Sequence, residues 1–136
     1  IDPYEFVSSF NLIMSQRLLR LNCKNCTVDD DTITEEIKKL SIDFEEHKNV
    51  AFKRGSGCRY CHDTGYLGRS GIFEVLELTP EIKQMILTRQ SPLEIKKAAI
   101  KNGLVPLRKA GWKKVEEGLT TFEEMNRVTF EEGALE

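Results

Sequence analysis

The sequence predicts an α+β fold, with strands in the first half of the chain and helices in the second half. Short apolar runs separated by glycine-rich turns extend as far as Leu78, and helix-start signals recur after it. Two Cys-x-x-Cys pairs in the first half predict a small metal-stabilised subdomain. A length of 136 residues with 40% hydrophobic residues fits one domain or two very small ones with a real core, so disorder throughout is not expected.

The first element expected is a short helix that begins after Asp2. Asp2 has the side chain of an N-cap, Pro3 suits the first helical position, and Glu5 could complete a capping box. Phe6 and Phe10 would then share one face of this helix, four residues apart.

The residues from 12 to 21 are compatible with either a helical stripe or a buried strand, because periodicity cannot separate the two for so short an apolar run. A second strand could occupy residues 50–53. Glycines at three positions in 65–71 require special backbone angles. The mostly apolar run that follows, residues 72–78, predicts a strand.

The segment between the two cysteine pairs is strongly acidic. Residues 29–46 contain eight acidic side chains against Lys38 and Lys39, and a short helix is expected at about residues 33–40. We interpret the acidity as a solvated face, with a docking surface as the alternative. His47 lies in the same charged stretch and is expected to face solvent.

Four helices are expected after Leu78, each with its own start signal. Gly103 and Gly118 stand where C-terminal caps belong. Trp112 falls off the main apolar stripe of its helix and is expected on a packing or partner surface. The starts are Thr79-Pro80, Ser91-Pro92 with Glu94, Pro106, and Thr121 with Glu124. The predicted inward stripes are Ile82, Met85 and Ile86; Leu93, Ile95, Ala98 and Ala99; Leu107, Ala110 and Val115; and Phe122, Met125 and Val128.

The two cysteine pairs are Cys23 with Cys26 and Cys58 with Cys61, and 31 residues lie between the pairs. Two such turns can offer Zn²⁺ four sulfur ligands in a closed site, which is usually structural. Zinc ribbons more often have about 15–20 residues between the pairs, so the longer spacing implies an inserted subdomain. Two disulfides, or inert or redox thiols, are the alternatives. His62 follows the second pair and is expected outside the ligand set or at the surface.

Several kinds of chemistry are absent from the sequence. It has no phosphate-binding Gly-x-x-x-x-Gly-Lys-Ser/Thr motif, no Gly-x-Gly-x-x-Gly fingerprint and no His-Glu-x-x-His, so we expect no catalytic residue in this chain. No apolar run approaches the ~20 residues of a membrane-spanning helix. A net charge of −2 disfavours a general nucleic-acid binder. A free-standing zinc-ribbon adaptor or nucleic-acid-binding module stays open as an alternative, because Lys53, Arg54, Arg59 and Arg69 gather near the second cysteine pair.

Three strings together resemble one known family. Residues 15–26 resemble its Gln-Arg-Leu-x-Arg…Cys-x-x-Cys element, residues 57–74 resemble its glycine- and arginine-containing signature, and residues 118–129 resemble its C-terminus. The family is the secretion ATPases of type II secretion and type IV pilus assembly, the GspE/PilB type. The resemblance extends over nearly the whole chain.

The resemblance implies that this chain is the last part of a longer, hexameric ATPase. Family members carry an N-terminal docking region and a RecA-like core with the phosphate-binding loop, which would precede this chain; Ile1 in place of Met agrees with an excised piece. The family also implies a strand at about residues 12–20. The expected segments are 1–22, the end of the RecA-like core (helix then strand); 23–63, the tetracysteine zinc subdomain with the acidic insertion; 64–78, the glycine-rich segment and a strand returning to the core; 79–132, the C-terminal helical subdomain; and 133–136, a tag remnant.

Residue roles follow from the resemblance only at matching positions. Cys23, Cys26, Cys58 and Cys61 match the family's zinc ligands. Arg69, Arg17 and Gln16 match positions near the nucleotide or subunit boundary, although a local salt bridge or simple packing would also explain them. ATP and Mg²⁺ would bind only in the parent, whose ring would drive secretion or pilus assembly with inner-membrane platform proteins. The parent would be cytoplasmic, at the inner membrane through partners, without nucleic acid and without direct membrane insertion, and this part alone would be inactive.

Overall fold

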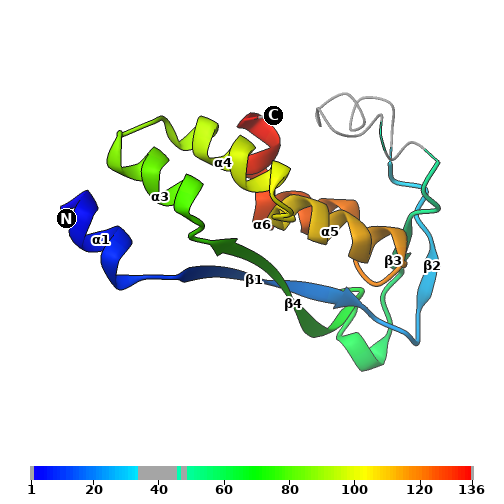
Figure 1. The fold of residues 1–136 in the computed structure, drawn as a ribbon. Helices are drawn as coiled ribbons and strands as arrows, with labels where there is room; N and C mark the ends of the chain where they lie inside the picture. Colours follow the sequence, from blue (N-terminus) through cyan, green and yellow to red (C-terminus); the bar gives the residue numbers. More distant parts are fainter. Residues whose placement is uncertain (1, 34–45, 47–48, 136) are drawn as a thin grey trace. The chain divides into compact units, whose positions relative to one another are not determined.

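The computed structural model describes residues 2–33, 46 and 49–135, the last six of these by their backbone alone. The chain divides into two compact units, one formed by Ile1–Gln16 with Phe73–Pro106 and the other by Arg17–Ile72 with Leu107–Glu136. Two long strands, β1 (Leu12–Asn22) and β4 (Tyr66–Glu77), pair in a two-stranded sheet and contribute residues to both units (Figure 1).

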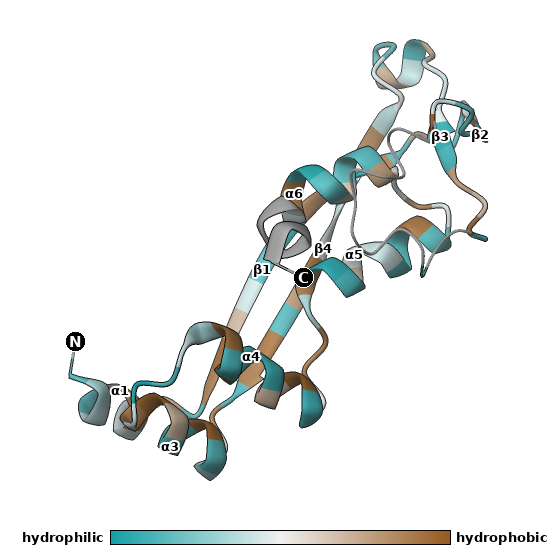
Figure 2. Cartoon of the chain, turned by 90° about the horizontal axis from the view of Figure 1, so that it is seen from above, coloured by the Kyte–Doolittle hydropathy of each residue, from teal (hydrophilic) through white to brown (hydrophobic). Residues whose placement is uncertain are grey.

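Both strands were anticipated in part. β1 confirms the strand at residues 12–20 and excludes the helical alternative, while β4 begins six residues before the predicted start at residue 72. Along both strands the hydropathy changes repeatedly between hydrophobic and hydrophilic residues (Figure 2). Burial alternates at the start of β1, where Ile13 is half-buried between the exposed Leu12 and Met14, so neighbouring side chains there lie on opposite faces of the strand.

The first unit is built from three helices and the adjoining ends of the two strands. The helices are α1 (Pro3–Ser9), α3 (Pro80–Leu87) and α4 (Pro92–Lys101). Leu78, Ile82 and Ala99 form the buried centre of this unit, and partly buried residues of α1 and β1 pack against it, among them Phe6 and Ile13. Hydrophobic burial by residues from five elements therefore organises this unit.

The helix starts in this unit confirm the predicted capping signals. The Asp2 carboxylate accepts a hydrogen bond from the backbone N–H of Tyr4 at 2.9 Å. The hydroxyls of Thr79 and Ser91 accept from backbone N–H groups three residues later, at 3.3 and 3.2 Å. A proline follows each cap directly, and its fixed φ angle suits the first helical position.

One predicted stripe is wrong at Leu93. Ala99 is buried and Ile95 and Ala98 are half-buried, but the side chain of Leu93 is 50% exposed. At 100° per residue, Ile95, Ala98 and Ala99 lie on one side of α4, and Leu93 lies on the opposite side. The stripe therefore has three members, and the outer face of α4 carries an aliphatic residue.

The second unit contains a pair of short antiparallel strands and two helices. β2 (Thr27–Asp29) pairs with β3 (Lys53–Gly55), with Val28 opposite Arg54. The strand proposed for residues 50–53 is therefore displaced toward the C-terminus. Val50 and Phe52 instead pack against the helical core of this unit. The predicted helix at about residues 33–40, and His47, lie outside the described residues.

The two helices of this unit are α5 (Leu107–Glu116) and α6 (Phe122–Leu135). Their shared core contains Trp112, Val115, Phe122 and Met125. The ring of Trp112 lies 5.4 Å from that of Phe122 and 6.3 Å from that of Phe52, measured between centroids. Trp112 is 1% exposed, so the packing role predicted for it is confirmed and the partner-surface role is wrong. The segment around Phe52 covers the face of α5 that lies off the main stripe.

Candidate metal centre

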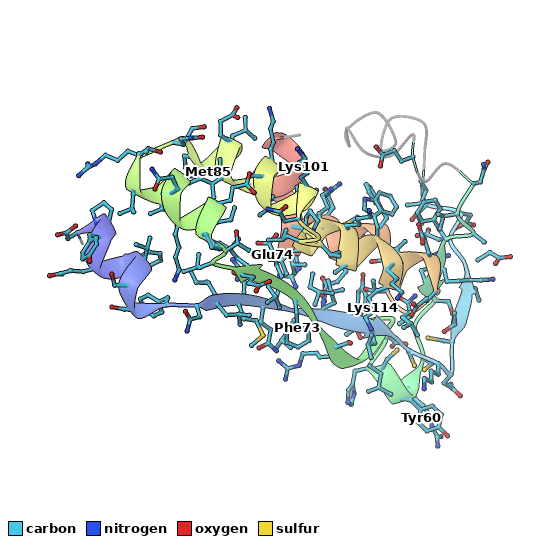
Figure 3. All side chains as sticks on the ribbon, in the orientation of Figure 1. Tyr60, Phe73, Glu74, Met85, Lys101 and Lys114 are labelled. Carbon is cyan, nitrogen blue, oxygen red and sulfur yellow. The ribbon has the colours of Figure 1, made fainter. Side chains whose placement is uncertain are left out.

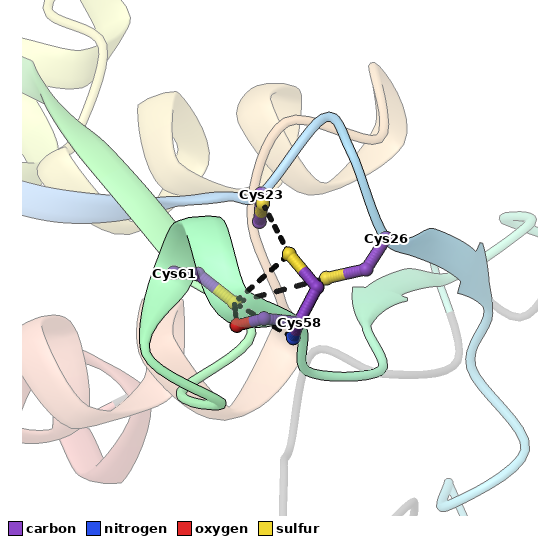
Figure 4. Close-up of side chains that lie close together, drawn as sticks. All are labelled: Cys23, Cys26, Cys58 and Cys61. Atoms are coloured by element: carbon purple, nitrogen blue, oxygen red, sulfur yellow. Dashed lines mark hydrogen bonds between the residues drawn. The ribbon is translucent and has the colours of Figure 1, made fainter.

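The four cysteines come from two turns that the fold brings together. Cys23 directly follows β1, and Cys26 directly precedes β2. Cys58 is the N-cap of a short 3-10 helix (Arg59–Cys61), and Cys61 is its last residue. Figure 4 shows the four side chains converging on one point.

The distances between the sulfur atoms fit a metal ion better than a disulfide. The Sγ atoms all lie within 4.8 Å of one another. Three of the separations are 3.7 Å for Cys23–Cys58, 3.9 Å for Cys26–Cys61 and 3.7 Å for Cys58–Cys61. Four sulfurs about 2.3 Å from a central Zn²⁺ in a tetrahedron are about 3.8 Å apart, whereas a disulfide bond is about 2.05 Å long. All four cysteines are free, so they could together hold one ion.

Backbone N–H groups point at two of the sulfurs. Gly57 donates to Cys26 Sγ, and both Cys58 and Gly65 donate to Cys61 Sγ, each at 3.3 Å. Such bonds favour the thiolate form, and the thiolate is the form that binds metal. Groups of this kind around the ligands orient them and tune their basicity.

The thiols of the cluster differ in their acidity. A hydrogen bond from the Asn25 side chain lowers the pKa of Cys58 to about 6, and backbone N–H groups add to this effect. Burial raises the pKa of Cys26 to about 11. The protein alone therefore favours one thiolate and opposes another. Four thiolates at this spacing need a cation between them.

The tight turns around the cysteines depend on backbone positions without a side chain. Gly65 has φ of 81°, and a Cβ added there would meet the carbonyl oxygen of Gly55. A Cβ on Gly55 would in turn meet the carbonyl oxygen of Gly65. The two backbones therefore approach as closely as glycine allows. This contact lies beside the ligand loop, since the Gly65 carbonyl also accepts from the N–H of Cys23 at 2.9 Å.

His62 is not part of the ligand group. It is exposed, it has φ of 53°, and it caps the short 3-10 helix. Within the described residues, the group of ligand atoms that includes Cys61 contains cysteine sulfurs only. His62 therefore lies at the surface, one of the two positions expected for it.

The comparison with known proteins shows the family to which the chain belongs. The profile of the family described as "Type II/IV secretion system protein" matches residues 1–127. The chain belongs to this family. The resemblance of the three sequence strings is therefore confirmed.

Several curated members of the secretion system family are similar to this chain. A type IV pilus assembly ATPase PilB from Pseudomonas aeruginosa is 37% identical over 95% of this chain and 23% of its own length. The PilB of Thermus thermophilus is 34% identical over 96% of this chain and 15% of its own length. The type II secretion system protein E of P. aeruginosa is 34% identical over 97% of this chain and 26% of its own length. The chain thus spans about a quarter or less of the length of these relatives.

The remaining predicted site residues of this family member lie on the two long strands. Gln16 and Arg17 are exposed on β1, and Arg69 is exposed on β4. Arg69 makes no ion pair with any residue in the described part of the chain. The roles of the three side chains near a nucleotide or subunit boundary stay predictions. No helix among the described residues is both long enough and apolar enough to cross a membrane.

A charge network around one buried carboxylate was not predicted. Glu124 is fully buried and accepts hydrogen bonds from the guanidinium groups of Arg20 and Arg127, at 2.8 to 3.1 Å. The guanidinium of Arg20 also lies 4.2 Å from the centroid of the Tyr66 ring, and the Tyr66 hydroxyl is 2.7 Å from that of Thr121. The sequence signalled only the local part of this network, the capping of α6 by Thr121.

Proposed function

We propose that this chain is the C-terminal zinc-binding part of a hexameric secretion-motor ATPase that powers type II protein secretion or type IV pilus assembly. Its role there would be structural: it would supply subunit contacts and rigidity. The observation that carries the proposal is the tetrahedral spacing of four cysteine sulfurs in a member of the secretion system family. Relatives named for each of the two pathways are similar to the chain, so the proposal covers both.

The zinc ion would act as a structural element. Four sulfurs fill a tetrahedral site and leave no open position for a substrate or water. The ion would tie the end of β1, the start of β2 and the turn at Cys58–Cys61 to one another. Because such a site seldom forms without its metal, the binding free energy would contribute directly to folding.

The strands would be the last part of a RecA-like core. Support comes from the face of the strands in the first unit that lies away from the helical core. Leu12, Met14, Phe73 and Val75 are between 42% and 59% exposed, and they alternate with residues that face that core. A row of exposed apolar side chains indicates a surface that another layer covers, and preceding parts of the parent would supply it. Segments 1–22, 23–63, 64–78 and 79–132 would then have the roles predicted for them.

The nucleotide would bind elsewhere in the parent. We propose that ATP and Mg²⁺ bind the phosphate loop of the RecA-like core and that Arg69, Arg17 and Gln16 lie near the nucleotide or a neighbouring subunit. An exposed guanidinium is suited to pair with a phosphate or carboxylate in fork geometry. The parent would work at the cytoplasmic face of the inner membrane through platform proteins. This part alone would not hydrolyse ATP.

A free-standing zinc-ribbon adaptor or nucleic-acid-binding module is the alternative, and the ion pairs of two basic residues count against it. Lys53 pairs with Asp29, and Arg54 pairs with Asp30 and Asp31. Cations neutralised in this way contribute little to phosphate binding. In a nucleic-acid titration, the binding constant should not depend steeply on salt concentration. A steep fall of affinity with salt, corresponding to several phosphate contacts, would favour the alternative.

Metal content and chelation test the proposed function. Elemental analysis of the purified chain should give one zinc per chain. After verified removal of the metal, amide-resolved NMR should show loss of signal dispersion first at residues 23–61. Unchanged dispersion would refute the structural role of the ion. ATP turnover by the purified chain, above that of a buffer control, would refute the account of an inactive part.

A further inference from the structure

Helix α4 has a second apolar face that points away from the core of its unit. Ile95, Ala98 and Ala99 occupy the inner side of α4. On the opposite side, Leu93 and Ile100 are 50% and 43% exposed. They are seven residues apart, nearly two helical turns, and so lie one above the other along the helix.

Lysines flank this aliphatic pair on both sides. At 100° per residue, Lys97 and Lys101 lie beside Leu93 and Ile100 on one side, and Lys96 lies on the other. Lys101 is labelled on α4 in Figure 3. The ammonium of Lys97 is 3.9 Å from the carboxylate of Glu94, and both side chains are more than half exposed, so this pair is loose.

The helices that carry this face are basic, whereas the chain as a whole is slightly acidic. Residues 80–105 contain five basic and two acidic side chains, against 20 Lys+Arg and 22 Asp+Glu in the complete sequence. The surface is therefore suited to an anionic partner that also accepts aliphatic side chains.

We propose that the outer face of α4 is a peripheral contact with the anionic surface of a lipid bilayer. Leu93 and Ile100 would enter the headgroup region, and Lys97 and Lys101 would reach lipid phosphates with their ammonium groups while their methylene stems cover the aliphatic pair. Lysine is depleted at protein–protein interfaces, where aromatic residues and arginine are enriched, and all three cations of this face are lysines. Helix α4 would lie parallel to the bilayer surface. This contact does not depend on the metal centre, so it goes beyond the proposed function.

Vesicle co-sedimentation of the zinc-loaded chain tests the contact. We expect binding to vesicles of mixed phosphatidylcholine and phosphatidylglycerol, weakening as salt is added, and no binding to vesicles of phosphatidylcholine alone. Lys97→Gln/Lys101→Gln should weaken binding by about 25-fold, since each lysine near an anionic surface contributes about fivefold. Leu93→Ser/Ile100→Ser should weaken it by about tenfold.

A matched control on another helix separates this face from general charge. Lys113→Gln/Lys114→Gln on α5 makes the same change in charge and should leave binding unchanged. Equal losses in the two lysine pairs, equal binding to both vesicle types, or full binding by the Leu93→Ser/Ile100→Ser variant would each overturn the proposal.

A fluorescence measurement keeps the test decisive if the double serine variant fails to fold. The native Trp112 is buried, so a tryptophan introduced by Leu93→Trp reports on the outer face of α4. Brominated phosphatidylglycerol vesicles should quench the added emission, whereas they should leave that of the unmodified chain unchanged. Absence of quenching would refute contact between this position and the bilayer.

Discussion

Glu124 accepts a hydrogen bond from the backbone N–H of Arg20 at 2.7 Å while it also binds the guanidinium of the same residue. One buried carboxylate on α6 thus holds both the main chain and the side chain of a residue on β1. Thr120 strengthens the connection, because its hydroxyl donates to the carbonyl oxygen of Arg20 at 2.7 Å. Both ends of this contact belong to the unit that contains the metal centre.

Glu124→Gln should therefore lower the stability of the chain. The amide keeps the shape of the side chain but loses the charge that binds Arg20 and Arg127, and it turns one acceptor into a donor. We expect a loss of about 2–3 kcal/mol in the free energy of unfolding, measured by urea titration. Glu123→Gln, at the exposed neighbouring position, is the control and should change this free energy by less than about 0.5 kcal/mol. Equal effects of the two substitutions would contradict the structural role of the network.

The same carboxylate should make stability depend on pH in the acid range. Burial alone would raise the pKa of Glu124, but hydrogen bonds from Arg127 and Arg20 lower it to about 2. A lowered folded-state pKa gives stability that is fully present above the unfolded value of about 4.3 and is lost as pH falls toward 2. Urea midpoints measured from pH 6 downward at about half-unit intervals should fall more steeply below about pH 4.5 in the unmodified chain than in Glu124→Gln. Parallel curves would refute the low pKa.

Cys61→Ser should abolish the metal site. Cys61 Sγ receives two backbone N–H bonds and lies 3.7 Å from Cys58 Sγ, so its loss removes a ligand at the centre of the cluster. We expect the zinc content to fall from one per chain to less than about a tenth, because three remaining ligands leave the site open to water. His62→Ala, one position later, should retain the full zinc content. Loss of zinc in the histidine variant would show that His62 belongs to the ligand set.

Gly65→Ala should be among the most destabilising glycine substitutions. The new Cβ would meet the carbonyl oxygen of Gly55, and φ of 81° is unfavourable for alanine. We expect a loss of more than about 3 kcal/mol, read from thermal unfolding. Gly103→Ala is the matched control, because φ there is 107° and nothing lies within 4 Å of the added Cβ. Gly103→Ala should lower the free energy of unfolding only through backbone strain, by about 1–2 kcal/mol. A cost at Gly65 no greater than at Gly103 would argue against the close approach of the two backbones.

Local signals predicted the helix boundaries of the C-terminal half well. Caps such as Ser91 act on backbone groups three residues away, so their effect is visible in a short window of sequence. The cysteine pairs were equally informative, since two sulfurs in one turn restrict the ligand geometry before folding. The family strings added the strand at residues 12–20, which periodicity alone left undecided.

Burial on the far side of a helix was harder to predict. Trp112 was placed off the main stripe, yet the segment around Phe52 covers it. Leu93 was assigned to a stripe, yet its side of α4 is uncovered among the described residues. A helical wheel gives the relative directions of side chains, but which direction is covered depends on segments distant in sequence.

The sequence by itself therefore determined the α+β class, the positions of the helix starts and the four cysteines as one candidate metal site, because each depends on residues a few positions apart or on a specific spacing. Tertiary structure alone decided that the sulfurs of Cys23 and Cys58 lie 3.7 Å apart, that Gly55 and Gly65 meet, and that Glu124 is buried against Arg20. These contacts join residues from 10 to 104 positions apart. Their energies depend on the exclusion of water and on close packing, which arise only when the elements assemble.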